Sequence, residues 1–170
     1  MKMTTKRIAL CAVLTALALG LSTLENLFPI GLIVPLPGIK LGLANIVTLF
    51  ALYELGIGPA LIILTGRCFL GSLFAGNLNA LLFSLLGGLS AMLVMFVLKH
   101  CRKLSLFGVS IGGAAAHNIG QICAAMITLG STMVLGYLPI LLCSSLISGT
   151  LTGFIAGLLF KAMKNVHLGG

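Results

Sequence analysis

The sequence has 170 residues, which is the length of one domain, and its composition excludes a soluble one. Hydrophobic residues make up 59% of the chain and charged residues only 7%, whereas a soluble domain carries roughly 25% charged residues. The net charge of +8 comes from lysines and arginines that mostly lie at the ends of apolar runs, which is typical of membrane orientation signals rather than of nucleic-acid binding.

Six apolar segments approach the length of about 20 residues that a membrane-spanning helix needs. They are Arg7–Leu24, Lys40–Leu55, Ile57–Ala75, Leu78–Leu98, Gly108–Leu129 and Tyr137–Phe160. The N-terminal stretch has the charge of a signal peptide, but no clear cleavage site follows it, so we interpret it as a retained first helix. The predicted fold is therefore an all-α integral membrane protein, in which residues 1–170 form one compact bundle of six transmembrane helices.

The first two segments are separated by a long stretch rich in proline and glycine, Glu25–Ile39. Its three prolines argue against a continuous helix. Irregular backbone at membrane depth is tolerated only where protein or a cavity covers it. We expect this loop to lie over the membrane face or to fold back into it, whereas most other connections are tight turns.

Basic residues predict the orientation of the bundle. Clusters precede the first segment and follow the fourth and the sixth: Lys2, Lys6 and Arg7; Lys99, Arg102 and Lys103; Lys161 and Lys164. With six spans, all three clusters fall on the same side, which the positive-inside rule assigns to the cytoplasm. Both termini are then cytoplasmic, and the Glu25–Ile39 loop lies outside.

One charged side chain, Arg67, lies inside a predicted span. A buried arginine costs at least about 2.5 kcal/mol in insertion scales. A salt bridge would offset this cost, but Glu54 should lie at the cytoplasmic end, and Glu25, at the outer end of the first segment, could at best approach. Because intramembrane charges are usually functional, we expect Arg67 to meet an anionic or strongly polar ligand that enters from outside.

The fifth segment carries three polar residues, His117, Asn118 and Gln121, in the sequence AAAHNIGQICAA. Their spacing of three and four allows one helix face to present all three side chains. Interhelical hydrogen bonds, each worth about 1 kcal/mol, are the alternative interpretation. Three such residues in a chain with an excess of cations favour a pocket.

Two more polar residues open the second segment, Lys40 and, just over one turn later, Asn45. A lysine at a helix end commonly extends to the lipid headgroups. However, a helix N-terminus offers free N–H groups and a partial positive charge, so an added cation makes an anion site. Glu25 and Asn26 are expected beside the same outer mouth. The predicted substrate-binding residues are Lys40, Asn45, Arg67, His117, Asn118 and Gln121.

The first segment shows a stripe of small residues, with Ala12 and Ala16 four positions apart. A smooth stripe of this kind suits close contact with another helix. The sequence leaves open whether that helix belongs to the same bundle or to a partner subunit.

Five stretches, taken in order, resemble the Gx transporter family, whose members are often labelled heptaprenyl diphosphate synthase component I. They are PGIKLGLANIVTLFALYELG, GRCFLGSLFAG, SLLGGLSAMLVM, GVSIGGAAAHNIGQ, and YLPILL followed by SGTLTG. The family is similar in turn to the S-components of energy-coupling-factor (ECF) transporters. These are six-helix proteins that capture micronutrients and work with a transmembrane coupling subunit and two cytoplasmic ATPases.

The resemblance implies a location in the bacterial plasma membrane and a contact between Ala12, Ala16 and the coupling subunit. It also implies that the loop Glu25–Ile39 closes the binding site. We therefore expect a substrate-binding subunit that captures a small amphipathic or anionic micronutrient, or an isoprenoid-type precursor, from outside.

The sequence also bears on the synthase label. The chain contains no aspartate, whereas the usual prenyl synthases hold Mg²⁺ with aspartate-rich motifs. It also lacks the GxxxxGK[ST] phosphate loop. We expect no catalysis, cofactor or metal site in this chain. Two alternatives remain open, a membrane accessory subunit of a polyprenyl diphosphate synthase and a stand-alone secondary carrier, although few intramembrane acids are present for ion coupling.

Overall fold

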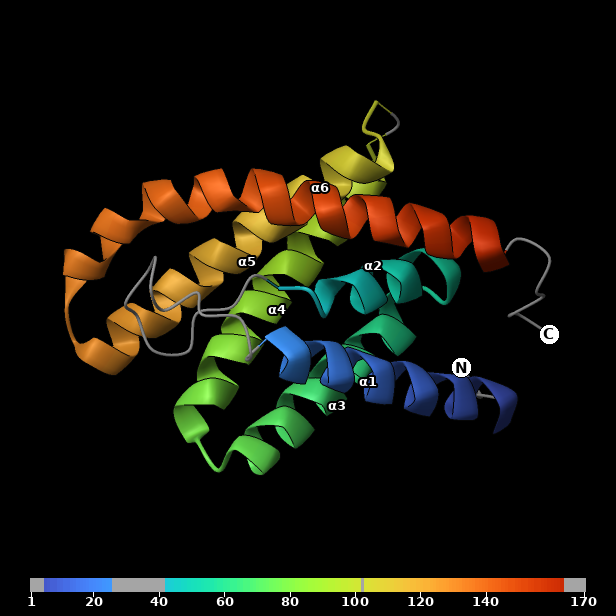
Figure 1. Cartoon of the computed structure of the whole chain (residues 1–170), viewed down its shortest axis with the longest axis horizontal. Helices are drawn as coiled ribbons and strands as arrows, with labels where there is room; N and C mark the ends of the chain where they lie inside the picture. The colour runs from blue at the N-terminus through green and yellow to red at the C-terminus, as the bar shows by residue number, and fades with distance from the viewer. Residues whose placement is uncertain (1–4, 26–41, 102, 164–170) are drawn as a thin grey trace.

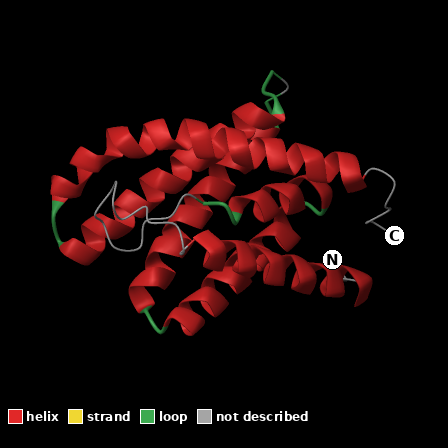
Figure 2. Cartoon of the chain, in the orientation of Figure 1, coloured by secondary structure: helices red, strands yellow, loops and turns green. Residues whose placement is uncertain are grey.

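The computed structural model describes residues 5–25, 42–101 and 103–163, and within these ranges every regular element is a helix (Figures 1 and 2). The elements are α1 (Thr5–Glu25), α2 (Asn45–Glu54), α3 (Ile57–Ala75), α4 (Leu78–Lys99), α5 (Leu106–Leu129), the 3₁₀ helix η2 (Thr132–Tyr137) and α6 (Leu138–Met163). The beginning of α1 and the end of α6 lie at the same end of the molecule, on the right of Figure 1.

Five of the six predicted segments coincide closely with a helix, and the second one differs. It was expected to begin at Lys40, but α2 begins at Asn45. Gly42 has a φ of +84°, in the left-handed region that ends regular helix, and Leu43 and Ala44 form a turn. Lys40 and nearly all of the predicted Glu25–Ile39 loop lie outside the described residues.

Four helical stretches in the described part of the chain are long and apolar enough to cross a membrane. They are Thr5–Glu25, Ile57–Ala75, Leu78–Lys99 and Thr132–Met163. Helix α5 has 24 residues, but its apolar run is interrupted by polar ones. Helix α2 has ten residues. At 1.5 Å per residue these reach about 15 Å, half of the hydrocarbon core, so the helical part of α2 is too short to span it.

The exposed faces of the long helices are apolar. Phe74, Leu93 and Ile147 are 75%, 66% and 77% exposed, and many other large apolar side chains are exposed in the same way. By contrast, α1 buries the polar residues Ser22 and Glu25. Large apolar surfaces of this extent require lipid to cover them, and the protein is therefore a membrane protein.

Helix α2 lies at the centre of the bundle and contacts α1, α3, α4 and α6 (Figure 1). Every residue from Ala44 to Leu52 is buried. A helix that is apolar on all sides needs such an enclosed position. The rings of Phe50 and Phe160 pack with their centroids 5.3 Å apart and join α2 to α6.

Helix α5 packs between α4 and α6, and glycines bring the three backbones together. A Cβ atom on Gly120 would lie 2.4 Å from the carbonyl oxygen of Leu86 in α4. One on Gly149 of α6 would lie 2.6 Å from Cα of Ile111 in α5. These contacts show why small residues are scattered through the apolar segments.

The C-terminal end of α2 is held by a lysine of α4. Lys99 Nζ donates to the carbonyl oxygen of Leu52 at 2.8 Å and lies 4.8 Å from the centroid of the Tyr53 ring. The last carbonyls of a helix have no partner within the helix, and a cation there also interacts favourably with the helix dipole. Lys99 therefore fixes the position of α2 along the bundle.

Replacing Lys99 by Met should lower the free energy of unfolding by about 1–2 kcal/mol, because one carbonyl hydrogen bond and the cation–π contact are lost. Thermal unfolding of the purified protein in detergent would measure this change. Lys103→Met, at an exposed residue of the following loop, is the matched control and should leave the unfolding temperature unchanged. Equal effects of the two substitutions would contradict the role assigned to Lys99.

Candidate functional site

A cluster of buried polar side chains surrounds the N-terminal end of α2. Its members come from four helices and are Glu25 of α1, Asn45 of α2, Arg67 of α3, and His117 and Gln121 of α5, which are 2%, 5%, 6%, 3% and 1% exposed. Two of them carry formal charges at neutral pH. Burying such groups is costly unless they are hydrogen-bonded or paired, so their convergence needs a physical account.

Hydrogen bonds connect the two charged members through the start of α2. The carboxylate of Glu25 accepts a hydrogen bond from the backbone N–H of Gly42. The carbonyl oxygen of Gly42 accepts from the backbone N–H of Asn45 at 2.8 Å. The side-chain oxygen of Asn45 then accepts from Arg67 Nη2 at 3.2 Å. The chain of contacts thus runs from α1 to α3 across α2.

Arg67 has donor capacity beyond this contact. Its hydrogen-bond partner is a neutral amide, and its Nε–H group is buried with no partner. A guanidinium offers five N–H donors in a planar fork. Because buried donors are nearly always satisfied in folded proteins, the unpaired Nε marks a position where an acceptor on a ligand or a water molecule would bind.

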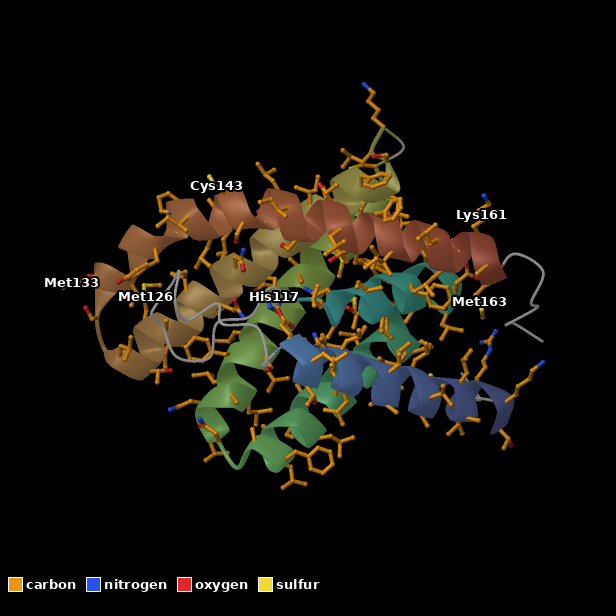
Figure 3. The ribbon with its side chains drawn as sticks, viewed as in Figure 1. His117, Met126, Met133, Cys143, Lys161 and Met163 are labelled. Carbon is orange, nitrogen blue, oxygen red and sulfur yellow. The ribbon has the colours of Figure 1, made fainter. Side chains whose placement is uncertain are left out.

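His117 lies in the middle of the bundle, where Figure 3 labels it, and two glycines make room for its ring. A Cβ atom on Gly87 of α4 would lie 2.9 Å from His117 Cε1 and 3.1 Å from Gln121 Cγ. One on Gly42 would lie 3.2 Å from His117 Cδ2. The neighbouring Gly88 likewise faces Arg67, whose Nη2 would lie 3.5 Å from an added Cβ. The two glycines of α4 therefore form the smooth wall against which the polar groups are held.

Asn118 faces a different neighbour from His117 and Gln121. Its side-chain Nδ2 donates to the backbone carbonyl of Leu141 in α6 at 2.6 Å. Successive residues of an α-helix are rotated by about 100°, so residues 117 and 118 point in different directions. The side chain of Asn118 holds α5 to α6, whereas residues 117 and 121 face α4 together.

Two further sets of predicted residues lie away from this cluster or outside the described ranges. Lys40 is not among the described residues. Ala12 and Ala16 are exposed and line an apolar groove of about 490 Å³ between α1 and α3, which Gly66 and Leu70 also line. The small-residue stripe therefore does not face the interior of its own bundle.

The prediction from sequence did not include Glu25 or the glycines among the site residues. Glu25 was expected beside the outer mouth, at the end of the first segment, from where it could approach Arg67. Its rarity was the available signal, since only two acids occur in the chain. The pair Gly87–Gly88 was visible in the sequence, but its position opposite His117 and Arg67 depends on the packing of α4 against α3 and α5.

A family model described as heptaprenyl diphosphate synthase component I matches residues 14–159, which is most of the chain and includes the described members of the cluster. No curated protein and no solved structure shows a significant match to the sequence.

The substitution Gly87→Ala should displace His117 and Gln121, because the new methyl group would lie about 3 Å from both side chains. We expect the free energy of unfolding to fall by about 1–3 kcal/mol, as is usual for overpacking. Thermal unfolding in detergent would test this. Gly20→Ala in α1, where an added Cβ meets nothing within 4 Å, is the control and should be neutral or slightly stabilising. A Gly87→Ala protein as stable as the control would disprove the packing described.

Proposed function

The chain belongs to the heptaprenyl diphosphate synthase component I family, the Gx transporter family, and from this premise we propose that it is a substrate-binding membrane subunit of an ECF-type uptake transporter. It captures a small amphipathic or anionic molecule, a micronutrient or an isoprenoid-type precursor, from the outer side of the plasma membrane. Partner subunits then drive its delivery inward.

The observation that carries this proposal is the unpaired Nε of Arg67 in the buried cluster at the N-terminal end of α2. A guanidinium with a free donor, an imidazole and two amides can orient a polar head. The buried side chain of Leu64 lies beside Arg67 against Gly88, so apolar groups adjoin the polar ones. Ligand sites generally combine mostly apolar walls with a few placed polar groups. Intramembrane charges that face the bundle interior are functional in most cases.

The proposed topology has six passes through the bilayer, with α2 as the helical part of the second pass, and both termini in the cytoplasm. The start of α1 and the end of α6 lie together at one end of the molecule (Figure 1), which supports it. Exposed basic residues occur at these two helix ends, Lys6 on α1 and Lys161 on α6. In this arrangement α2 crosses only part of the bilayer. The polar cluster lies at the outer end of α2, and the Lys99 contact lies at the cytoplasmic end of α2.

The partners in this proposal are a transmembrane coupling subunit and two cytoplasmic ATPases. The chain itself contains no aspartate and no phosphate-loop motif, so energy would come from the partners. The groove between α1 and α3, lined by Ala12, Ala16 and Gly66, is a smooth apolar surface. Small residues allow another membrane helix to approach closely, which suits a coupling subunit.

A membrane accessory subunit of a polyprenyl diphosphate synthase is the second candidate, and the description of the family favours it. In that role the same cluster would hold a lipid substrate for a separate catalytic chain. Co-purification distinguishes the two candidates, because a prenyltransferase would accompany the protein in one case and ATPases with a coupling subunit in the other.

The site is tested by Arg67→Ala. Native mass spectrometry of the purified protein should show a retained small molecule in the wild type and a loss of at least tenfold in the variant. This corresponds to the removal of a hydrogen bond to a charged group, worth about 1.5–3 kcal/mol. Lys161→Ala, at an exposed residue near the end of α6, is the control and should retain the molecule. Unchanged retention in Arg67→Ala would remove Arg67 from the site.

The docking surface is tested by replacing Ala12 and Ala16 with Leu. The larger side chains would fill the groove against α3, so recovery of the coupling subunit in pull-downs should fall at least tenfold while ligand retention is kept. Ala162→Leu, at an exposed residue near the end of α6, adds the same bulk elsewhere and should have no effect. If the variant with Leu at both positions still recovers the coupling subunit, the coupling subunit docks on another face of the protein.

A further inference from the structure

Glu25 occupies a position where a bound anion would otherwise be expected. The side chain is 2% exposed, and its carboxylate accepts a hydrogen bond from the backbone N–H of Gly42, in the turn that precedes α2. The N-terminal end of a helix attracts negative charge through its free N–H groups and its dipole. Helix α2 has no side-chain cap of its own at this end, so the carboxylate of α1 supplies the negative charge from a distant part of the sequence.

The same carboxylate belongs to the chain of hydrogen bonds that reaches Arg67. Contacts through Gly42 and Asn45 link the two groups, and charges in a buried, low-dielectric interior act on one another more strongly than in water. The other acid of the chain, Glu54, is exposed and lies at the opposite end of α2. Glu25 is therefore the acid that faces the polar cluster.

We propose that Glu25 is a specificity-determining residue of the site, because its buried carboxylate is the resident counter-ion of Arg67. This inference rests on the proposed function, in which the cluster binds the ligand's polar head. The site then selects a head group that is polar but carries no full negative charge, such as an uncharged heteroatom ring or a zwitterion. Among the cargo classes proposed above, it favours the amphipathic ones over a free diphosphate.

The reasoning follows from the charges and their burial. A phosphate or diphosphate bound to Arg67 would place two or more negative charges near the carboxylate of Glu25. Like charges repel strongly where the effective dielectric constant is low, and neither group can be screened by water there. A neutral acceptor on the ligand can instead satisfy the unpaired Nε of Arg67 without disturbing the balance of charge in the cluster.

Pyrophosphate binding tests the proposal directly, since pyrophosphate is the head of the disfavoured class. The full chain is reconstituted in lipid nanodiscs, and the affinity for pyrophosphate is measured by calorimetry. We expect the wild type and the control Glu54→Gln to show no measurable binding. Glu25→Gln should bind at least tenfold more tightly than either, and adding Arg67→Gln should abolish the gain. Wild-type binding as tight as that of Glu25→Gln, or no gain in Glu25→Gln, overturns the proposal.

Unfolding temperatures provide an independent test that needs no ligand. This test remains decisive even where Glu25→Gln alone folds poorly. Arg67→Gln should destabilise the protein by leaving the carboxylate uncompensated, and Glu25→Gln in the same chain should restore part of the loss. Additive destabilisation in the double variant overturns the counter-ion assignment. Both tests are made on the isolated chain, so they can fail while the coupling subunit still co-purifies, and the proposed transport role can fail while they succeed.

Discussion

The structure depends on how a membrane bundle accommodates a guanidinium in its interior. Arg67 is 6% exposed in a helix that is otherwise apolar. Its cost is offset by several polar groups, and these come from different helices. The amide of Asn45, the carboxylate of Glu25 and the glycine wall of α4 therefore meet at one place. That requirement fixes where α1, α2, α3 and α4 come together.

Helix α2 makes this meeting possible because it is short. A full span would run past the centre of the bundle, whereas a ten-residue helix ends within it and presents its unsatisfied backbone groups there. Its N-terminal end faces Glu25 and Arg67, and its C-terminal end is held by Lys99. Irregular backbone at membrane depth is tolerated only where protein covers it, and the burial of Gly42 and Ala44 meets this condition. The same geometry produces both the central packing and the polar cluster.

Much of the fold followed from the sequence because hydropathy and turn residues are local signals. Segments such as Ile57–Ala75 were predicted with their exact bounds, since Gly56 and Gly76 flank them with positive φ angles. The start of α2 was missed because a single glycine in an apolar stretch does not reveal its φ angle. In the site, Asn45, Arg67, His117 and Gln121 were predicted and lie in one buried cluster. The partners of Asn118 and Glu25 were not predictable, because each depends on which helix packs opposite.

An internal counter-ion also has a consequence for the empty state of the protein. A site built of cations alone would leave buried charges uncompensated whenever no ligand was bound, and insertion into the bilayer would be penalised. If Glu25 is the counter-ion of Arg67, as we propose, the cluster is balanced before a ligand arrives. A ligand then needs to displace a water molecule or to satisfy an unpaired donor, and it does not need to neutralise a charge. Its affinity can come mainly from the apolar body of the ligand, while the polar groups determine which head is accepted.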